Sequence, residues 1–409
     1  MTTITADVAV APRRSFQEVW VISLGHALTH WYPATFYLLL PLIGKELGLS
    51  YSEIGAVLTC QYFAGAIANI PGGIFVDTVG RKGLLMAASL FWIGFPYLIM
   101  GFSHAYWMIL ACATLVGIGN NLWHPSAIPW LANRFPQRKG LVMSIHGMGG
   151  NVGDAVAPLV VGALLGFMSW RDVVVINVVP GVLIAAFALI YLGRRQNGED
   201  AVSADAALKI SAAERVRMFG ALLKNRALIT LAAGSAFRTM TQGALLTFLP
   251  LYLARQMGYP PLWIGACMFA LQAGGFIAAP IAGHLSDRVG RRQIILSSMA
   301  MSAIVIFLML FAGGTGWFVM FVSVLGFFLF AVRAVLQAWL LDATPPAMGG
   351  SAIGLLFASQ AFGQAVGPVS AGIVADHYGL MSAFYFLAGT IVVANFLVFV
   401  TPAGLMKRD

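Results

Sequence analysis

The amino-acid sequence predicts an all-α integral membrane protein with twelve transmembrane helices in two six-helix bundles. Three observations lead to this prediction. Hydrophobic residues make up 59% of the 409 residues and charged residues only 10%, whereas soluble domains have roughly 45–50% and about 25%. The apolar residues form twelve long, continuous runs. A single long polar stretch divides these runs into two groups of six.

Each apolar run approaches or exceeds the length of about 20 residues that a helix needs to cross the hydrocarbon core. Their continuous apolar character indicates helices, because the strands of a membrane barrel alternate instead. Several runs are separated by only a few residues and must form helical hairpins. The predicted helices cover residues 18–43, 52–76, 84–103, 106–132, 141–166, 171–193, 226–252, 261–284, 293–313, 315–341, 351–375 and 380–402.

The polar stretch predicts a linker at 194–225, between an N-terminal bundle at 1–193 and a C-terminal bundle at 226–409. Nineteen of the 24 Lys and Arg residues lie on the side that holds both termini and this linker, and three lie on the opposite side. By the positive-inside rule, both termini and the linker are cytoplasmic. The formal net charge of +9 therefore reflects membrane topology, and we expect no nucleic-acid partner.

Soluble enzymes and metalloproteins are not indicated. The three cysteines, Cys60, Cys112 and Cys267, lie inside apolar runs and fit neither a disulfide framework nor a metal-ligand spacing. The sequence shows no nucleophile triad, metal cluster or phosphate-binding loop. We therefore expect no enzymatic activity, no resident metal and no cofactor.

The two halves of the chain repeat each other at an offset of about 210 residues. Such a repeat gives two bundles related by an axis along the membrane normal, with a central cavity between them. The shared pattern Gly-x3-Asp-x2-Gly-Arg suits a tight turn with a carboxylate near an arginine. It occurs at Gly73, Asp77, Gly80 and Arg81, and again at Gly283, Asp287, Gly290 and Arg291.

This repeated element resembles the signature loop of the major facilitator superfamily, which follows the second and eighth helices. The resemblance covers the whole chain and implies alternating access in a multi-pass protein of the bacterial inner membrane. In that family the loop closes the cytoplasmic side, and the eight motif residues carry over to this gating role. Segments 23–26, 117–125 and 149–159 are similar to the fosmidomycin-resistance branch, which is known for proton-driven drug export. At His30, Ser126 and Asp154 this sequence differs from the residues typical of that branch. The resemblance therefore does not identify the substrate.

Polar and ionisable residues inside the predicted helices indicate where a substrate binds, because such groups are costly in lipid and usually face a cavity. The resemblance implies that the first, fourth, seventh and tenth helices line this cavity. Aligning the halves pairs His26 with Arg238 and His124 with Arg333. The predicted cavity residues are His26, His30, Asn120, His124, Arg238, Gln242, Arg333 and Gln337.

Four of the ionisable residues are predicted proton carriers: His26, His124, His146 and Asp154. Imidazoles titrate near physiological pH, so the first half has titratable cations where the second has permanent ones. His146 and Asp154 are eight residues apart, on one helix stripe and about 12 Å apart along the axis. Structural roles remain the alternative: hydrogen bonds between helices for the histidines, and struts held by backbone carbonyls or Asp154 for the arginines.

These observations predict a proton-coupled secondary transporter that works as a monomer. We expect it to export a small, anionic organic compound or drug by antiport, using the proton gradient and no cofactor. Two arginines in the cavity suit a phosphonate, phosphate or carboxylate. The main alternative is uptake of an organic anion by proton symport. Metalloid efflux and a non-transporting scaffold or sensor are more remote alternatives.

Overall fold

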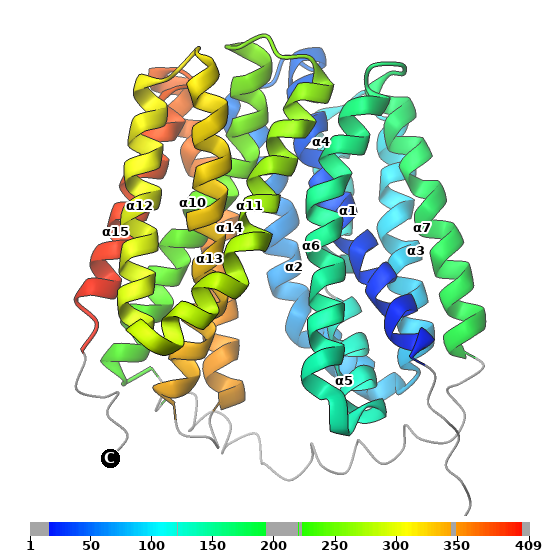
Figure 1. Ribbon diagram of the computed structural model, residues 1–409. Helices are drawn as coiled ribbons and strands as arrows, with labels where there is room; N and C mark the ends of the chain where they lie inside the picture. The colour runs from blue at the N-terminus through cyan, green and yellow to red at the C-terminus, as the bar shows by residue number, and fades with distance from the viewer. Residues whose placement is uncertain (1–15, 121, 194–219, 221–222, 345–348, 403–409) are drawn as a thin grey trace, which may run out of the picture.

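In the computed structural model, residues 16–120, 122–193, 220, 223–344 and 349–402 are described. These residues form thirteen α-helices and one short 3-10 helix, Pro136–Arg138, and include no strand. Figure 1 shows the helices standing side by side in two bundles. The first bundle contains α1 (Gln17–Glu46), α2 (Tyr51–Val79), α3 (Lys82–Gly101), α4 (Tyr106–Asn120), α5 (Trp123–Arg134), α6 (Lys139–Leu164) and α7 (Trp170–Gly193). The second contains α10 (Arg226–Arg255), α11 (Pro261–Val289), α12 (Arg291–Phe311), α13 (Gly316–Asp342), α14 (Gly349–Tyr378) and α15 (Ser382–Phe399).

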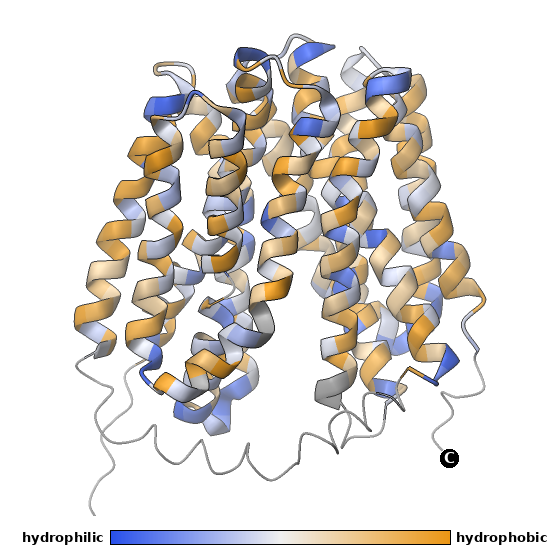
Figure 2. Ribbon diagram, turned by 180° about the vertical axis from the view of Figure 1, so that it is seen from behind, coloured by the Kyte–Doolittle hydropathy of each residue, from blue (hydrophilic) through white to orange (hydrophobic). Residues whose placement is uncertain are grey.

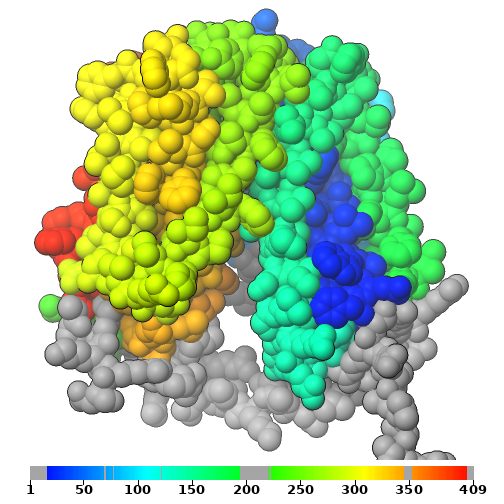
Figure 3. Space-filling view, in the orientation of Figure 1, coloured from blue at the N-terminus to red at the C-terminus, as the bar shows by residue number. Residues whose placement is uncertain are grey.

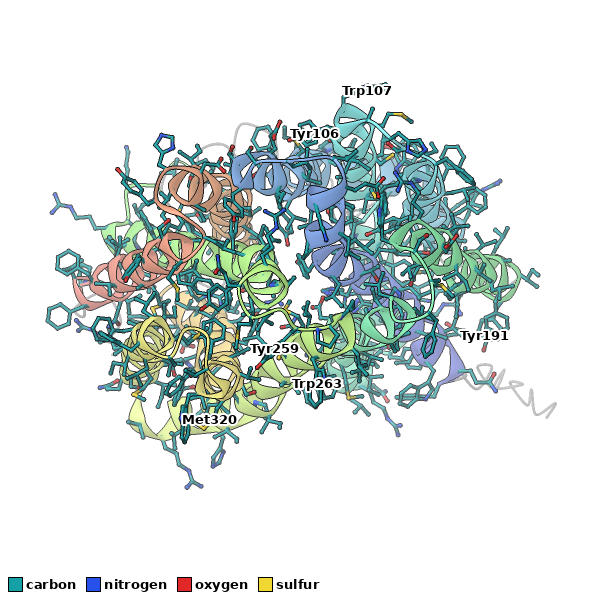
Figure 4. The ribbon with its side chains drawn as sticks, turned by 90° about the horizontal axis from the view of Figure 1, so that it is seen from above. Tyr106, Trp107, Tyr191, Tyr259, Trp263 and Met320 are labelled. Carbon is teal, nitrogen blue, oxygen red and sulfur yellow. The ribbon has the colours of Figure 1, made fainter. Side chains whose placement is uncertain are left out.

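The outward-facing surfaces of both bundles are apolar. Figure 2 shows mainly hydrophobic residues along the outer helices. Among the described residues, seven helices are long and apolar enough to cross a membrane. Exposed aromatic side chains such as Trp107 (68% exposed) and Trp263 (62%) point outwards from the helices (Figure 4). They lie in the first turns of α4 and α11, as expected at a membrane–water interface. The count of twelve spans stays a prediction. The predicted linker and both termini lie largely outside the described residues.

Eleven of the twelve predicted ranges correspond to one helix each. The fourth range, 106–132, is wrong as one continuous helix, because α4 ends at Asn120 and α5 begins at Trp123. Pro125 lies in the first turn of α5, where a proline is tolerated. A proline alone does not account for the break, because α1 continues through Pro33 and Pro41. The break matters for the site, because it separates Asn120 from His124.

Close backbone packing repeats between the bundles. A Cβ added at Gly149 of α6 would lie 2.2 Å from the carbonyl oxygen of Ser23 in α1. In the second bundle, a Cβ added at Gly363 of α14 would lie 2.0 Å from the carbonyl oxygen of Ala236 in α10. Glycine is therefore required at both places, and the internal repeat of the sequence is also a repeat of helix packing.

The two bundles meet at one end of the molecule, where α2 packs against α14 and α6 against α11. A Cβ added at Gly55 would lie 2.4 Å from the carbonyl oxygen of Pro368, and one at Gly265 would lie 2.3 Å from that of Pro158. We call this end, where α2 begins and α14 ends, the sealed end. At the opposite end, the open end, Figure 3 shows a notch between the bundles.

Asp376 connects the two bundles at the sealed end. Its carboxylate, near the end of α14, accepts hydrogen bonds from the backbone N–H groups of Tyr51 (2.7 Å) and Ser52 (2.9 Å) at the start of α2. These N–H groups have no partner within their own helix, and the helix dipole favours a negative charge there. A side chain of the second bundle thus caps a helix of the first.

Asp376→Asn should favour opening of the sealed end, because an amide cannot accept both N–H groups with equal strength. A loss of about 1 kcal/mol corresponds to roughly a fivefold change in the ratio of sealed to opened molecules. The measurement is a distance distribution between spin labels at Phe167 and Trp317, two exposed residues at the sealed end of different bundles.

The matched control is Asp172→Asn. Asp172 accepts hydrogen bonds from Ser169 at the same end, but within the first bundle only. It should leave the distance distribution unchanged. Equal distributions for Asp376→Asn and the unmodified protein would show that this contact does not hold the sealed end.

Candidate functional site

Four imidazoles from three helices meet inside the first bundle. His26 and His30 come from α1, His124 from α5 and His146 from α6. The ring centroid of His26 lies 4.7 Å from that of His30, 4.9 Å from that of His124 and 4.0 Å from that of His146. His26 is buried at the centre of this group. We call these four residues the histidine cluster.

Glycines make room for the histidine cluster. The buried Trp123 lies against Gly25, where an added Cβ would be 2.1 Å from the indole ring. This fit sets α5 against α1 and brings their next residues, His26 and His124, together. A Cβ added at Gly150 of α6 would lie 2.7 Å from the ring of His26. A larger residue at Gly25 would therefore displace Trp123, and one at Gly150 would displace the imidazole of His26.

Hydrogen bonds fix the orientation of His26. Its Nδ1 lies 2.6 Å from the carbonyl oxygen of His146, which can only accept, so Nδ1 carries a proton and donates. In the neutral ring the Nε2 atom is then an acceptor. This Nε2 lies 3.1 Å from Nε2 of His124, which therefore donates to it. Both ring nitrogens of the buried His146 have no partner among the described residues.

Asp154 pairs with His30 rather than with His146. Its Oδ2 lies 2.9 Å from Nδ1 of His30, and the two side chains are 28% and 26% exposed. The predicted placement of His146 and Asp154 on one helix agrees with α6, but their side chains have different partners. The pair joins α1 to α6 and is reachable by water, unlike the buried His26.

Two tyrosines and a glutamine near Asp154 were not predicted from the sequence. The hydroxyl of Tyr37 in α1 lies 2.5 Å from that of Tyr62 in α2, and Tyr62 is hydrogen-bonded to Gln364 of α14. Both tyrosines interact electrostatically with Asp154. This network crosses from one bundle to the other. The sequence gives little indication of this network, because single tyrosines in apolar helices are common.

Arg238 is a buried residue with strong local partners. Its side chain is 1% exposed. It donates from Nη1 to the carbonyl oxygen of Leu329 in α13 (2.9 Å) and from Nη2 to Oε1 of Gln242 (3.0 Å). Its Nε has no partner among the described residues. The predicted proximity of Gln242 to Arg238 is confirmed, and Arg238 acts in this state as a strut between α10 and α13.

Arg333 on α13 differs from Arg238 because it is exposed. It interacts electrostatically with Arg238 of its own bundle and with His124 of the first bundle. Arg333 must therefore face the space between the bundles. No hydrogen bond or ion pair of Arg333 is found within the described part of the chain. Gln337, one turn later on α13, is half-buried.

Asn120 is the last residue of α4 and does not lie on the same helix as His124. We expected it to share a helix face with His124, but the break between α4 and α5 places the two residues on separate helices. Its Oδ1 atom is buried without a partner among the residues described. Its place in the cavity stays a prediction.

The structure shows more of the second copy of the Gly-x3-Asp-x2-Gly-Arg pattern than of the first. Gly80 and Gly290 have positive φ angles of 65° and 109°, which allow the tight turns after α2 and α11. In the second copy, Arg291 forms ion pairs with Asp287 (2.7 Å) and with Asp342 of α13 (2.9 Å).

In the first copy, Arg81 is exposed, and the side chain of Asp77 lies outside the described residues. An added Cβ at Gly73 or Gly283 would meet nothing within 4 Å in the described structure, so neither glycine lies at a close helix contact in this state. The gating role of both copies stays a prediction.

Comparisons with known proteins agree with this architecture. A family model described as the Major Facilitator Superfamily matches residues 22–279 and 233–408. The phosphoglycerate transporter protein of Salmonella typhimurium (strain LT2) is 23% identical over 97% of this chain and 91% of its own. The fosmidomycin resistance protein of Escherichia coli (strain K12) is 23% identical over 89% and 88%. A bacterial homolog of the human lysosomal transporter Spinster, in an inward-facing and occupied conformation, has a TM-score of 0.78 at 16% identity, covering 98% and 99%.

Two apolar-faced helix bundles with polar residues between them define a multi-pass membrane transporter. The chain belongs to the Major Facilitator Superfamily. It is a transporter of small molecules rather than an enzyme, and a protein of the bacterial inner membrane. The family assignment made from the sequence is confirmed, including the similarity to a fosmidomycin resistance protein.

Gly149→Ala should destabilise the first bundle, because the new Cβ would meet the carbonyl oxygen of Ser23, which cannot move without moving α1. Overpacking of this kind costs about 1–3 kcal/mol. The control is Gly147→Ala on the same helix, where nothing described lies within 4 Å of an added Cβ. That change should be neutral or stabilising by up to about 1 kcal/mol. Thermal unfolding in detergent measures both, and equal midpoints would contradict this account of helix packing.

Proposed function

We propose that this transporter exports a small organic anion by alternating access, in exchange for protons. The proposed negative charge of the substrate rests on Arg333. It is exposed between the bundles, and no partner is described for it. Arg238 is already bonded to Leu329 and Gln242, so Arg333 is the cation left to bind a ligand. A guanidinium next to other positive groups gains strongly from a bidentate oxyanion.

The relatives support the substrate class and the direction. One is named for phosphoglycerate, a phosphorylated organic acid, and the other for resistance to a drug. Resistance by a membrane transporter is most directly achieved by export. We therefore favour antiport, with uptake of an organic anion by proton symport as the second candidate, because coupling between proton and substrate works in either direction.

The proposal includes the membrane topology. We propose that α4 and α5 together form the fourth of twelve spans, that both termini are cytoplasmic and that one chain is the transporting unit. With this orientation, the open end faces the cytoplasm and the sealed end faces outwards. The similar fold of a transporter described as inward-facing supports this interpretation.

Asp154 is the proton carrier that we propose. It is 28% exposed and pairs with His30 across α1 and α6, so water can reach it from the space between the bundles. The nearby Tyr37–Tyr62–Gln364 network links it to α14 of the second bundle. A change of charge on Asp154 would thus act where the two bundles meet. The other predicted carriers, His26, His124 and His146, are more enclosed in the cluster.

Arg333→Ala should weaken the binding of a small phosphorylated or carboxylated anion about tenfold or more, since hydrogen bonds to charged groups are worth about 1.5–3 kcal/mol. Arg333→Lys should recover part of this loss, because lysine keeps the charge but lacks the planar fork. Thermal stabilisation of the purified protein by a panel of anions and lipophilic cations measures the effect.

The control for this experiment is Arg138→Ala, which removes an exposed arginine from the short 3-10 helix after α5. It should respond to the panel like the unmodified protein. Stabilisation by lipophilic cations alone, unchanged in Arg333→Ala, would overturn the anionic substrate and favour a multidrug exporter of cations.

Asp154→Asn should abolish proton-driven accumulation of substrate in proteoliposomes while leaving substrate exchange without a pH gradient within a few-fold. An amide keeps the shape of the carboxyl group and a hydrogen bond to His30 but cannot carry a proton. The surface variant Asp172→Asn serves as the control, and the sign of the flux under an imposed pH gradient separates antiport from symport. Wild-type coupling in Asp154→Asn would remove Asp154 from the proton pathway.

A further inference from the structure

We propose that His26, His124 and His146 form a binding site for a divalent transition-metal ion of the Zn²⁺ type. One nitrogen from each side chain lies within 4.8 Å of the other two. The three residues come from α1, α5 and α6, so their spacing in the sequence shows no metal-binding pattern. Only the fold brings them together, which is why the sequence predicted no metal.

The first two ligands are arranged much as a metal site requires. Donation from Nδ1 of His26 to the backbone carbonyl of His146 leaves the Nε2 lone pair of His26 directed at His124, whose Nε2 proton it accepts in the absence of metal. A bound ion would replace that proton, and His124 would then carry its proton on Nδ1. Histidine ligands of metals usually make a hydrogen bond through their second nitrogen, as His26 does. Nε2 of His26 and Nε2 of His124 are 3.1 Å apart. Two nitrogens at about 2.0–2.1 Å from one tetrahedral ion lie about 3.3 Å apart.

The third ligand is His146, whose side chain is 5% exposed. Neither of its ring nitrogens has a hydrogen-bond partner among the described residues. Buried polar atoms without partners are rare and call for an explanation. A metal bond would satisfy one of them. The ring now stacks on that of His26 at 4.0 Å and 13°, so it must rotate to direct a nitrogen at the same ion.

The chemistry of the ligands selects the ion. Three imidazoles suit Zn²⁺, Ni²⁺, Cu²⁺ and Co²⁺, whereas Mg²⁺ and Ca²⁺ require oxygen ligands. Three protein ligands also leave a fourth position open, as in zinc sites that bind a further molecule. All three ligands belong to the first bundle, so a bound ion would join α1, α5 and α6 without tying the two bundles together.

The test is metal binding by the purified full-length protein, stripped with a chelator and carrying no histidine tag. Equilibrium dialysis against Zn²⁺ gives the stoichiometry, and the visible absorption of bound Co²⁺ reports its coordination. We expect one Zn²⁺ per chain and a tetrahedral Co²⁺ spectrum, with no binding of Mg²⁺. His26→Ala, His124→Ala and His146→Ala should each weaken Zn²⁺ binding at least tenfold.

Matched controls keep the test decisive. His284→Ala and His377→Ala remove exposed histidines outside the cluster and should bind Zn²⁺ like the unmodified protein. His146→Gln retains a polar side chain of similar length, and its thermal unfolding without metal shows whether loss of binding reflects loss of fold. Arg333→Ala should keep the metal while losing the anion, which separates this inference from the proposed function. Binding below one equivalent, or equal binding in all variants, would overturn the metal site.

Discussion

Contacts between glycines and backbone carbonyls hold the helices of each bundle together, and the polar site depends on them. Lipid tails are as apolar as leucine, so helices in a membrane gain little from burying apolar surface and associate through close packing. An added Cβ would lie 2.0 Å from the carbonyl oxygen of Gln61 at Gly117, and 1.9 Å from that of Leu271 at Gly326. These two pairs occupy equivalent positions in the internal repeat. The feature shared by both halves is therefore the approach of one backbone to another.

The same type of contact joins the two bundles at the sealed end, through Gly55 and Gly265. A glycine face has no side chain that interlocks with its partner, so two such faces can separate without forcing side chains into new rotamers. Directional hydrogen bonds, such as those that Asp376 accepts from α2, then decide how firmly the end is closed. A transporter that alternates between two openings needs this combination, because each seal must be specific and also reversible.

The sequence predicts which helices exist better than it predicts how they face each other. Apolar runs follow directly from the thickness of the membrane, and the bond between Arg238 and Gln242 follows from their spacing of one helix turn. The break in the fourth predicted helix had no distinct signal, because the apolar run is continuous there and other helices, such as α1 and α2, continue through internal prolines. The pair of His30 with Asp154 was not predictable, because it depends on the rotation and depth of two helices that lie more than 100 residues apart in the chain.

Divergence of side chains on a repeated backbone gives the two bundles different chemistry. Where the first bundle has His26 and His124, the second has Arg238 and Arg333. An imidazole can offer a lone pair to a cation, whereas a guanidinium can only donate to an anion. Because His124 and Arg333 interact across the space between the bundles, an ion on the histidines would add positive charge close to the proposed anion site. That charge would strengthen the attraction of the site for an anion. By linkage, a bound anion would strengthen the binding of the metal to the same degree.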